Sequence, residues 1–105
     1  MSIIDEATEV IHLEFADHDL VPALLGEHDG NLARIEQKLH VSISCFGNKV
    51  TVEGEKDAVV TAQSALTSLY RRLEGDIKAG KKLKTLDIGT VDAAVKWAQN
   101  TGDAA

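Results

Sequence analysis

The sequence predicts one small α+β domain in which helices cover one face of a three-stranded sheet. Three observations lead to this class. Apolar and polar residues alternate in three short segments, apolar residues recur at helical spacing in four others, and Gly47-Asn48 separates two of the alternating segments. The chain has 105 residues, of which 44% are hydrophobic and 27% charged, values that are typical of a single folded domain.

The strands are predicted from the alternating segments. Residues 10–16 form the first, because the apolar side chains at every second position would share one buried face. Residues 41–45 and 49–53 form the other two. Gly and Asn accept the positive φ angles of a tight turn, so Gly47-Asn48 predicts a hairpin between these two strands.

Two short helices are predicted between the first strand and the hairpin. The first begins near Leu20 with Asp19 as its cap, tolerates Pro22 in its first turn, and stops at Gly26. The second begins at Asn31 or Leu32, since the positions up to 39 carry an apolar stripe with charged residues around it.

Two further helices are predicted after the hairpin. The longest follows Gly54 and keeps its apolar period through residues 59–73. Residues 76–89 are expected to form a basic connector, with a short turn or strand around 83–88. The last helix is expected over residues 91–99 with Thr90 as its cap.

Charge is unevenly distributed along the chain. The net charge of −6 argues against a general nucleic-acid binder, and eight acidic residues precede Arg34, the first cation. Residues 70–84, by contrast, contain six cations and only two acidic residues. No apolar stretch is long enough for a membrane span, the first residues lack the basic character of a secretory signal, and Cys45 has no partner cysteine, so a cytoplasmic protein is expected.

The order strand, helix, helix, strand, strand, helix over the first 73 residues resembles a KH domain of type I. In KH domains a Gly-x-x-Gly loop joins the two short helices and clamps the backbone of about four nucleotides. Here the corresponding loop is Gly26-Glu27-His28-Asp29-Gly30, in which either the second glycine becomes Asp29 or one extra residue precedes Gly30. The residues after 75 add a C-terminal helical extension to this KH-like order.

A closer resemblance is to the N-terminal KH-like domain of PhoH-like, phosphate-starvation-inducible ATPases. It is carried by Leu25-Gly26-Glu27-His28-Asp29-Gly30-Asn31-Leu32 and Ile35-Glu36, and supported by Gly47-Asn48 and Leu69-Tyr70. It implies a KH-like domain over residues 1–75, ordered from about 10, followed by a connector and helix over 76–105. The connector is longer and more basic than the family leads us to expect.

The resemblance also implies an ATPase domain that this chain lacks, because no Gly-x-x-x-x-Gly-Lys-Ser/Thr segment is present. We therefore expect a non-catalytic fragment of a larger ATPase, with no cofactor of its own. ATP and Mg²⁺ would belong to the absent ATPase domain, which would be a partner of this one.

Two sets of residues are candidates for contact with RNA or single-stranded nucleic acid. The loop set is Gly26, Gly30, Asn31, Arg34, Lys38 and Lys49, and the basic set, which could equally contact an acidic protein partner, is Arg71, Arg72, Lys78, Lys81, Lys82 and Lys84. Acidic residues around the loop oppose phosphate binding there. The alternative is that the loop has no binding function and is a solvated turn, with Asn31 as the cap of the next helix.

Other chemistry finds little support in the sequence. Asp17-His18-Asp19 and Glu27-His28-Asp29 repeat a pattern of metal ligands but lack the spacing of zinc motifs, so no metal site is expected. Cys45 is expected to be a small core residue. The first functional hypothesis is an accessory domain that binds nucleic acid weakly, and the alternative is a protein-contact or oligomerisation module that binds none.

Overall fold

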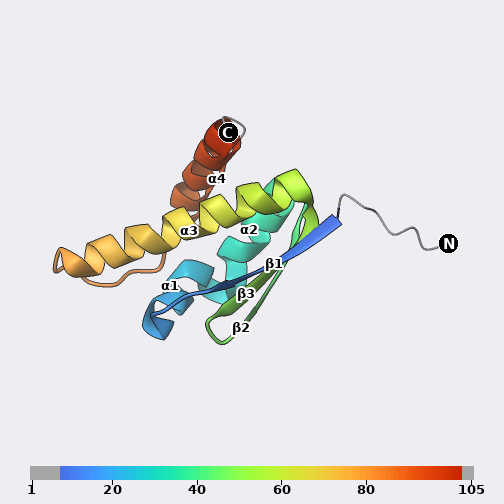
Figure 1. The fold of residues 1–105 in the computed structure, drawn as a ribbon. Helices are drawn as coiled ribbons and strands as arrows, with labels where there is room; N and C mark the ends of the chain where they lie inside the picture. The colour runs from blue at the N-terminus through green and yellow to red at the C-terminus, as the bar shows by residue number, and fades with distance from the viewer. Residues whose placement is uncertain (1–7, 103–105) are drawn as a thin grey trace.

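The structure, a computed structural model, describes the backbone of residues 8–102 (Figure 1). Asp5 and Glu6, two of the acidic residues counted above, lie outside the described residues. The elements in chain order are β1 (Thr8–Glu14), the 3-10 turn η1 (His18–Leu20), α1 (Val21–Leu25), the 3-10 turn η2 (Glu27–Asp29), α2 (Gly30–Leu39), β2 (Ser42–Phe46), β3 (Lys49–Glu55), α3 (Lys56–Lys78) and α4 (Ile88–Gly102).

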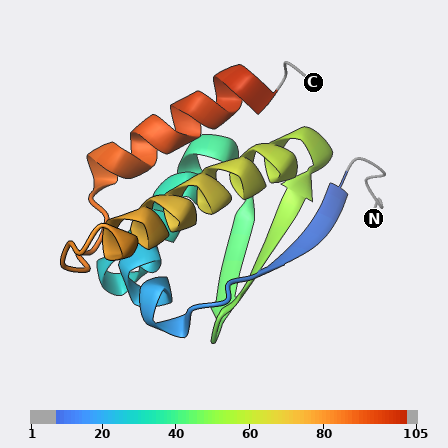
Figure 2. The ribbon, with the colours of Figure 1, turned by 60° about the vertical axis from the view of Figure 1, so that its left-hand side comes forward.

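The sheet is antiparallel with the strand order β1-β3-β2, so the last strand lies in the middle. Val50 and Val52 of this central strand are fully buried beneath the helices. Their neighbours Lys49, Thr51 and Glu53 point to the other face, which no helix covers (Figure 2). The alternation of apolar and polar residues in the sequence thus corresponds to one buried face and one open face of the sheet.

The hairpin predicted at Gly47-Asn48 is confirmed. Gly47 has a φ of 65°, which glycine adopts without steric cost. Asn48 also ties the turn to the end of β1, because its side-chain amide donates to the carbonyl oxygen of Phe15 at 2.7 Å and its own carbonyl accepts from the Phe15 N–H at 3.0 Å. The turn therefore sets the register of all three strands.

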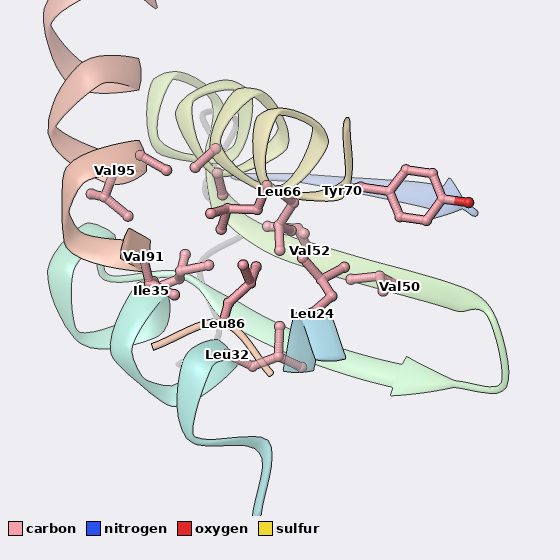
Figure 3. Close-up of a cluster of buried hydrophobic side chains, with 14 of the residues drawn as sticks. Leu24, Leu32, Ile35, Val50, Val52, Leu66, Tyr70, Leu86, Val91 and Val95 are labelled. Carbon is pink, nitrogen blue, oxygen red and sulfur yellow. The ribbon is translucent and has the colours of Figure 1, made fainter. Parts of the chain in front are cut away.

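The core lies between the covered face of the sheet and helices α1 to α4 (Figure 3). Leu32, Ile35 and Leu66, which lie on the apolar stripes of two predicted helices, are 4%, 0% and 0% exposed. At one edge of the core Tyr70 stacks on Phe15 with ring centroids 4.5 Å apart, and its hydroxyl accepts a hydrogen bond from the Asp17 N–H at 2.8 Å. This contact fastens the chain leaving β1 to α3.

Three local expectations need correction. The cap of the first helical turn is Asp17 and not Asp19, since Oδ1 of Asp17 accepts from the Asp19 N–H at 2.9 Å. Helix α3 runs past Gly75 to Lys78, because burial of its apolar stripe outweighs the modest helix cost of one glycine. Residues 81–87 form no strand.

The last helix is longer than predicted and has a different cap. It begins at Ile88, and Oδ1 of Asp87 accepts from the Thr90 N–H at 2.7 Å, so Thr90 lies inside the first turn. This hydrogen bond favours the carboxylate and holds the pKa of Asp87 below its ordinary value. The helix also continues past residue 99, its predicted end, to Gly102.

The predicted fold class is confirmed: the domain is α+β with a three-stranded sheet, a KH-like order of elements and an added C-terminal helix. That helix shares the core, since Val91, Val95 and Ala98 are at most 1% exposed. The boundary expected between residues 75 and 76 falls inside α3. Among residues 8–102, no helix combines the length and apolar character that a membrane span requires.

We predict that Leu66→Ala lowers the free energy of unfolding by about 2–5 kcal/mol, because it leaves a cavity where the side chain is fully buried. The matched control is Val60→Ala on the same helix, where the side chain is 43% exposed, and it should change stability by no more than about 0.5 kcal/mol. Urea unfolding monitored by circular dichroism measures both. Equal effects would contradict the core described here.

Candidate nucleic-acid interface

The turn that corresponds to the KH loop is tight. Gly26 ends α1 with a φ of 80°, and a Cβ atom there would lie 2.7 Å from the side chain of Asn31. His28 and Asp29 also have positive φ values, 53° and 57°, before α2 begins at Gly30. Both glycines of the candidate set thus lie in the turn, but only Gly30 has open space around its Cα.

Asn31 does not face the solvent. It is 3% exposed, and its Nδ2 donates to the carbonyl oxygens of Leu24 and Leu86, each at 3.0 Å. It is not the cap of α2, because the cap position is Asp29 and no side chain bonds there. The Asn31 amide therefore joins α1, α2 and the segment before α4, and is occupied in holding the fold.

Arg34 is paired with α4. Its Nε and Nη2 atoms donate to Oδ1 and Oδ2 of Asp92, both at 2.8 Å, in a bidentate ion pair. The hydrogen bonds with Asp92 raise the pKa of Arg34, and those with Arg34 hold the pKa of Asp92 below its ordinary value. The charge of Arg34 is thus largely neutralised within the domain.

The loop set as a whole is not brought to one surface. Lys38 is exposed on α2 and close enough to Asp92 to lower the pKa of that carboxyl further. Lys49 projects from β3 on the open face of the sheet, away from the helices. Asn31 is buried, Arg34 is paired, and Lys38 lies in the last turn of α2, at the opposite end of that helix from the Gly26–Gly30 turn.

The basic set has the opposite character. All six of its residues are exposed, on the last two turns of α3 and in the connector that follows; they are Arg71, Arg72, Lys78, Lys81, Lys82 and Lys84. We call this surface the basic end. Among the described residues, one ion pair involves these cations, and it is long: Nζ of Lys81 lies 3.9 Å from Oδ1 of Asp76. A depression of about 370 Å³ is lined there by Asp76, Lys81, Lys82 and Lys84.

The connector that carries these lysines is anchored at both ends. At its start the N–H groups of Gly80 and Lys81 donate to the carbonyls of Ile77 and Asp76, a Schellman motif that fixes how the chain leaves α3. At its far end the Leu86 N–H donates to Ala23 O at 3.0 Å, and its carbonyl accepts from Asn31. The connector thus returns beneath α3 to α1 (Figure 1).

Two other candidate chemistries have a simple structural account. Burial, together with the negative charge of Asp29, raises the pKa of the Cys45 thiol, so this cysteine is a poor nucleophile. Among the side chains that the structure describes, which do not include that of Glu27, no three from His, Cys, Asp or Glu come together as metal ligands.

Three polar residues that organise this region were not predicted from the sequence. Asp92 pairs with Arg34, Asp87 caps α4, and Glu36 accepts a hydrogen bond from the Ile43 N–H at 2.7 Å, which occupies the outer edge of β2. Asp92 lies 58 positions along the chain from Arg34. Asp87 lies at the start of a helix that was expected to begin later. A carboxylate just before the last apolar stripe was the available signal for Asp87.

Comparison with known proteins supports the fold and no more. No protein-family model matches the chain, and no curated protein is similar to it in sequence. It is similar in structure to a crystal structure of a protein of unknown function from Aeropyrum pernix, with a TM-score of 0.61 and 12% sequence identity. The similarity covers 95% of this chain and 53% of that protein, so the chain spans about half its length.

We predict that Asn31→Ala lowers the free energy of unfolding by about 1–3 kcal/mol, because the carbonyls of Leu24 and Leu86 lose a buried donor. Gln37→Ala, at an exposed position of the same helix, is the control and should have an effect within about 0.5 kcal/mol. Hydrogen exchange at the Leu86 N–H should also accelerate in Asn31→Ala. Unchanged exchange there would show that the amide does not hold the connector.

We predict that the pair of Arg34 and Asp92 makes stability depend on pH. The pKa of Asp92 is lowered in the folded state, so its contribution is present above the ordinary value of 3.8 and is lost as the pH falls through the lowered pKa. Asp92→Asn should therefore be less stable than the parent at neutral pH, and the gap should close on acidification. A gap that is independent of pH in urea unfolding would contradict the ion pair.

Proposed function

We propose that this chain is a non-catalytic, KH-like accessory domain of a cytoplasmic PhoH-like ATPase, and that it binds RNA or single-stranded nucleic acid weakly through the basic end. The observation that carries the proposal is the exposure of all six cations of that surface, whereas in the loop set Arg34 is paired with Asp92 and Lys49 lies on the open face of the sheet. Affinity for single strands comes largely from cations that displace counterions from phosphates.

The parent ATPase enters through the sequence resemblance. The two segments that carry that resemblance are connections between elements, since the turn of Gly26 to Asn31 joins α1 to α2 and Gly47-Asn48 joins β2 to β3. ATP and Mg²⁺ would bind to the ATPase domain, since this chain has no phosphate-binding motif to hold them. The role proposed for this chain is to hold single-stranded nucleic acid near the ATPase domain.

The second candidate is a protein-contact or oligomerisation module. It is favoured by the open face of the sheet, where Phe46 is 89% and Val10 51% exposed. This module would self-associate and ignore nucleic acid. Sizing the domain by light scattering separates the two, because the first candidate does not require a dimer.

We predict that a fluorescein-labelled, single-stranded RNA binds at low salt and dissociates as salt rises. Lys81→Gln/Lys82→Gln should weaken binding and reduce the slope of log K against log salt by about 1.4, since each phosphate contact contributes about 0.7 for a single strand. The control, matched in charge, is Lys49→Gln/Lys56→Gln, which removes exposed cations from the open sheet face and the far end of α3. An equal loss in both variants, or no binding at low salt, would refute the proposal.

A further inference from the structure

A second surface feature lies between α3 and α4. A groove of about 400 Å³ is lined by Gln63, Ser64, Thr67, Ser68, Arg71 and Trp97. Five of these residues come from α3 and Trp97 comes from α4. Trp97 is 52% exposed although it is the largest side chain of its helix.

The packing of the two helices explains the groove. Helix α4 contacts the rest of the domain through Val91, Ala94, Val95 and Ala98, which are at most 9% exposed. Alanines let the helices approach closely, so Trp97 at the margin of this contact is left over the polar side of α3. About half of the surface of Trp97 is therefore exposed, and Trp97 forms part of the wall of the groove.

The chemistry of the lining is selective. The sequence contains 17 acidic residues, yet the groove is lined by none, and Arg71 gives it a positive charge. Three hydroxyls and one amide, from Ser64, Thr67, Ser68 and Gln63, can both donate and accept hydrogen bonds. With Trp97 as its one apolar side chain, the groove suits a planar, polar, anionic ligand better than an apolar helix.

We infer that this groove binds a nucleotide unit, with the base stacked on the indole of Trp97 and the phosphate on the guanidinium of Arg71. An aromatic platform beside a cation is the arrangement by which proteins hold single strands without reading their sequence. Arg71 also belongs to the basic end, so a strand lying there continues into the groove. For the strand as ligand, the inference rests on the proposed function; a free nucleotide offers the same base and phosphate.

The test uses the single tryptophan of the chain as its probe. Stacking of a base on Trp97 should quench its fluorescence, so we expect quenching by a ten-nucleotide oligouridylate. An abasic strand of equal length carries the phosphates without the bases, and it should bind at the basic end without quenching. Titration with AMP asks whether a free nucleotide enters the same groove.

Variants separate stacking from charge. Trp97→Ala should weaken oligouridylate binding about tenfold, as expected for one lost stacking contact, and Trp97→Phe should retain most of the affinity. Phe46→Ala removes the other highly exposed aromatic side chain, on the open sheet face, and should leave affinity unchanged. Thermal unfolding by circular dichroism checks that each variant is folded, and the quenching of the parent protein needs no variant.

The outcomes distinguish the two proposals. Strand binding with quenching, weakened in Trp97→Ala and not in Phe46→Ala, supports both. Strand binding without quenching, and with full affinity in Trp97→Ala, overturns the groove and leaves the basic end as the binding surface. Quenching by AMP without strand binding supports the groove as a nucleotide site and overturns the proposed strand-binding function. No binding of either ligand overturns both.

Discussion

The arrangement of the helices depends on one buried polar side chain. The amide of Asn31 donates to carbonyls of α1 and of the segment that leads into α4, and so couples three segments that apolar packing alone would orient less strictly. Gly26 must be a glycine because Asn31 occupies the space of a Cβ atom. The same contact brings the connector back to the domain and thus determines where its lysines lie.

The same contact affects which of the two candidate surfaces keeps its positive charge. Once Asn31 has positioned the start of α4, Asp92 lies beside Arg34 and neutralises the main cation of the turn. The cations of α3 and the connector meet few carboxylates by comparison, and the pairing of Lys81 with Asp76 is long. Six of the 11 Lys and Arg residues of this acidic protein are therefore exposed at the basic end, and one of them, Arg71, also lines the groove with Trp97.

Most of the fold could be predicted because its signals are local. The apolar period of residues 59–73 required a long helix, and alternation on both sides of Gly47-Asn48 required a hairpin. Helix ends were predicted less well. Asp19 and Thr90 are good capping residues, but Asp17 and Asp87 occupy the cap positions, because the path of the chain decides which carboxylate meets the exposed N–H groups.

The KH-like order of elements, most of the core residues and the clustering of cations after Tyr70 could be predicted from local patterns, since periodicity, turn chemistry and charge are properties of neighbouring residues. Which polar residues form ion pairs and hydrogen bonds inside the domain could be learned only from the packing of distant segments. Arg34 and Asp92 are 58 positions apart, and Asn31 and Leu86 are 55 apart. Such pairs have no local pattern, because they form only after packing has brought distant segments within hydrogen-bonding distance.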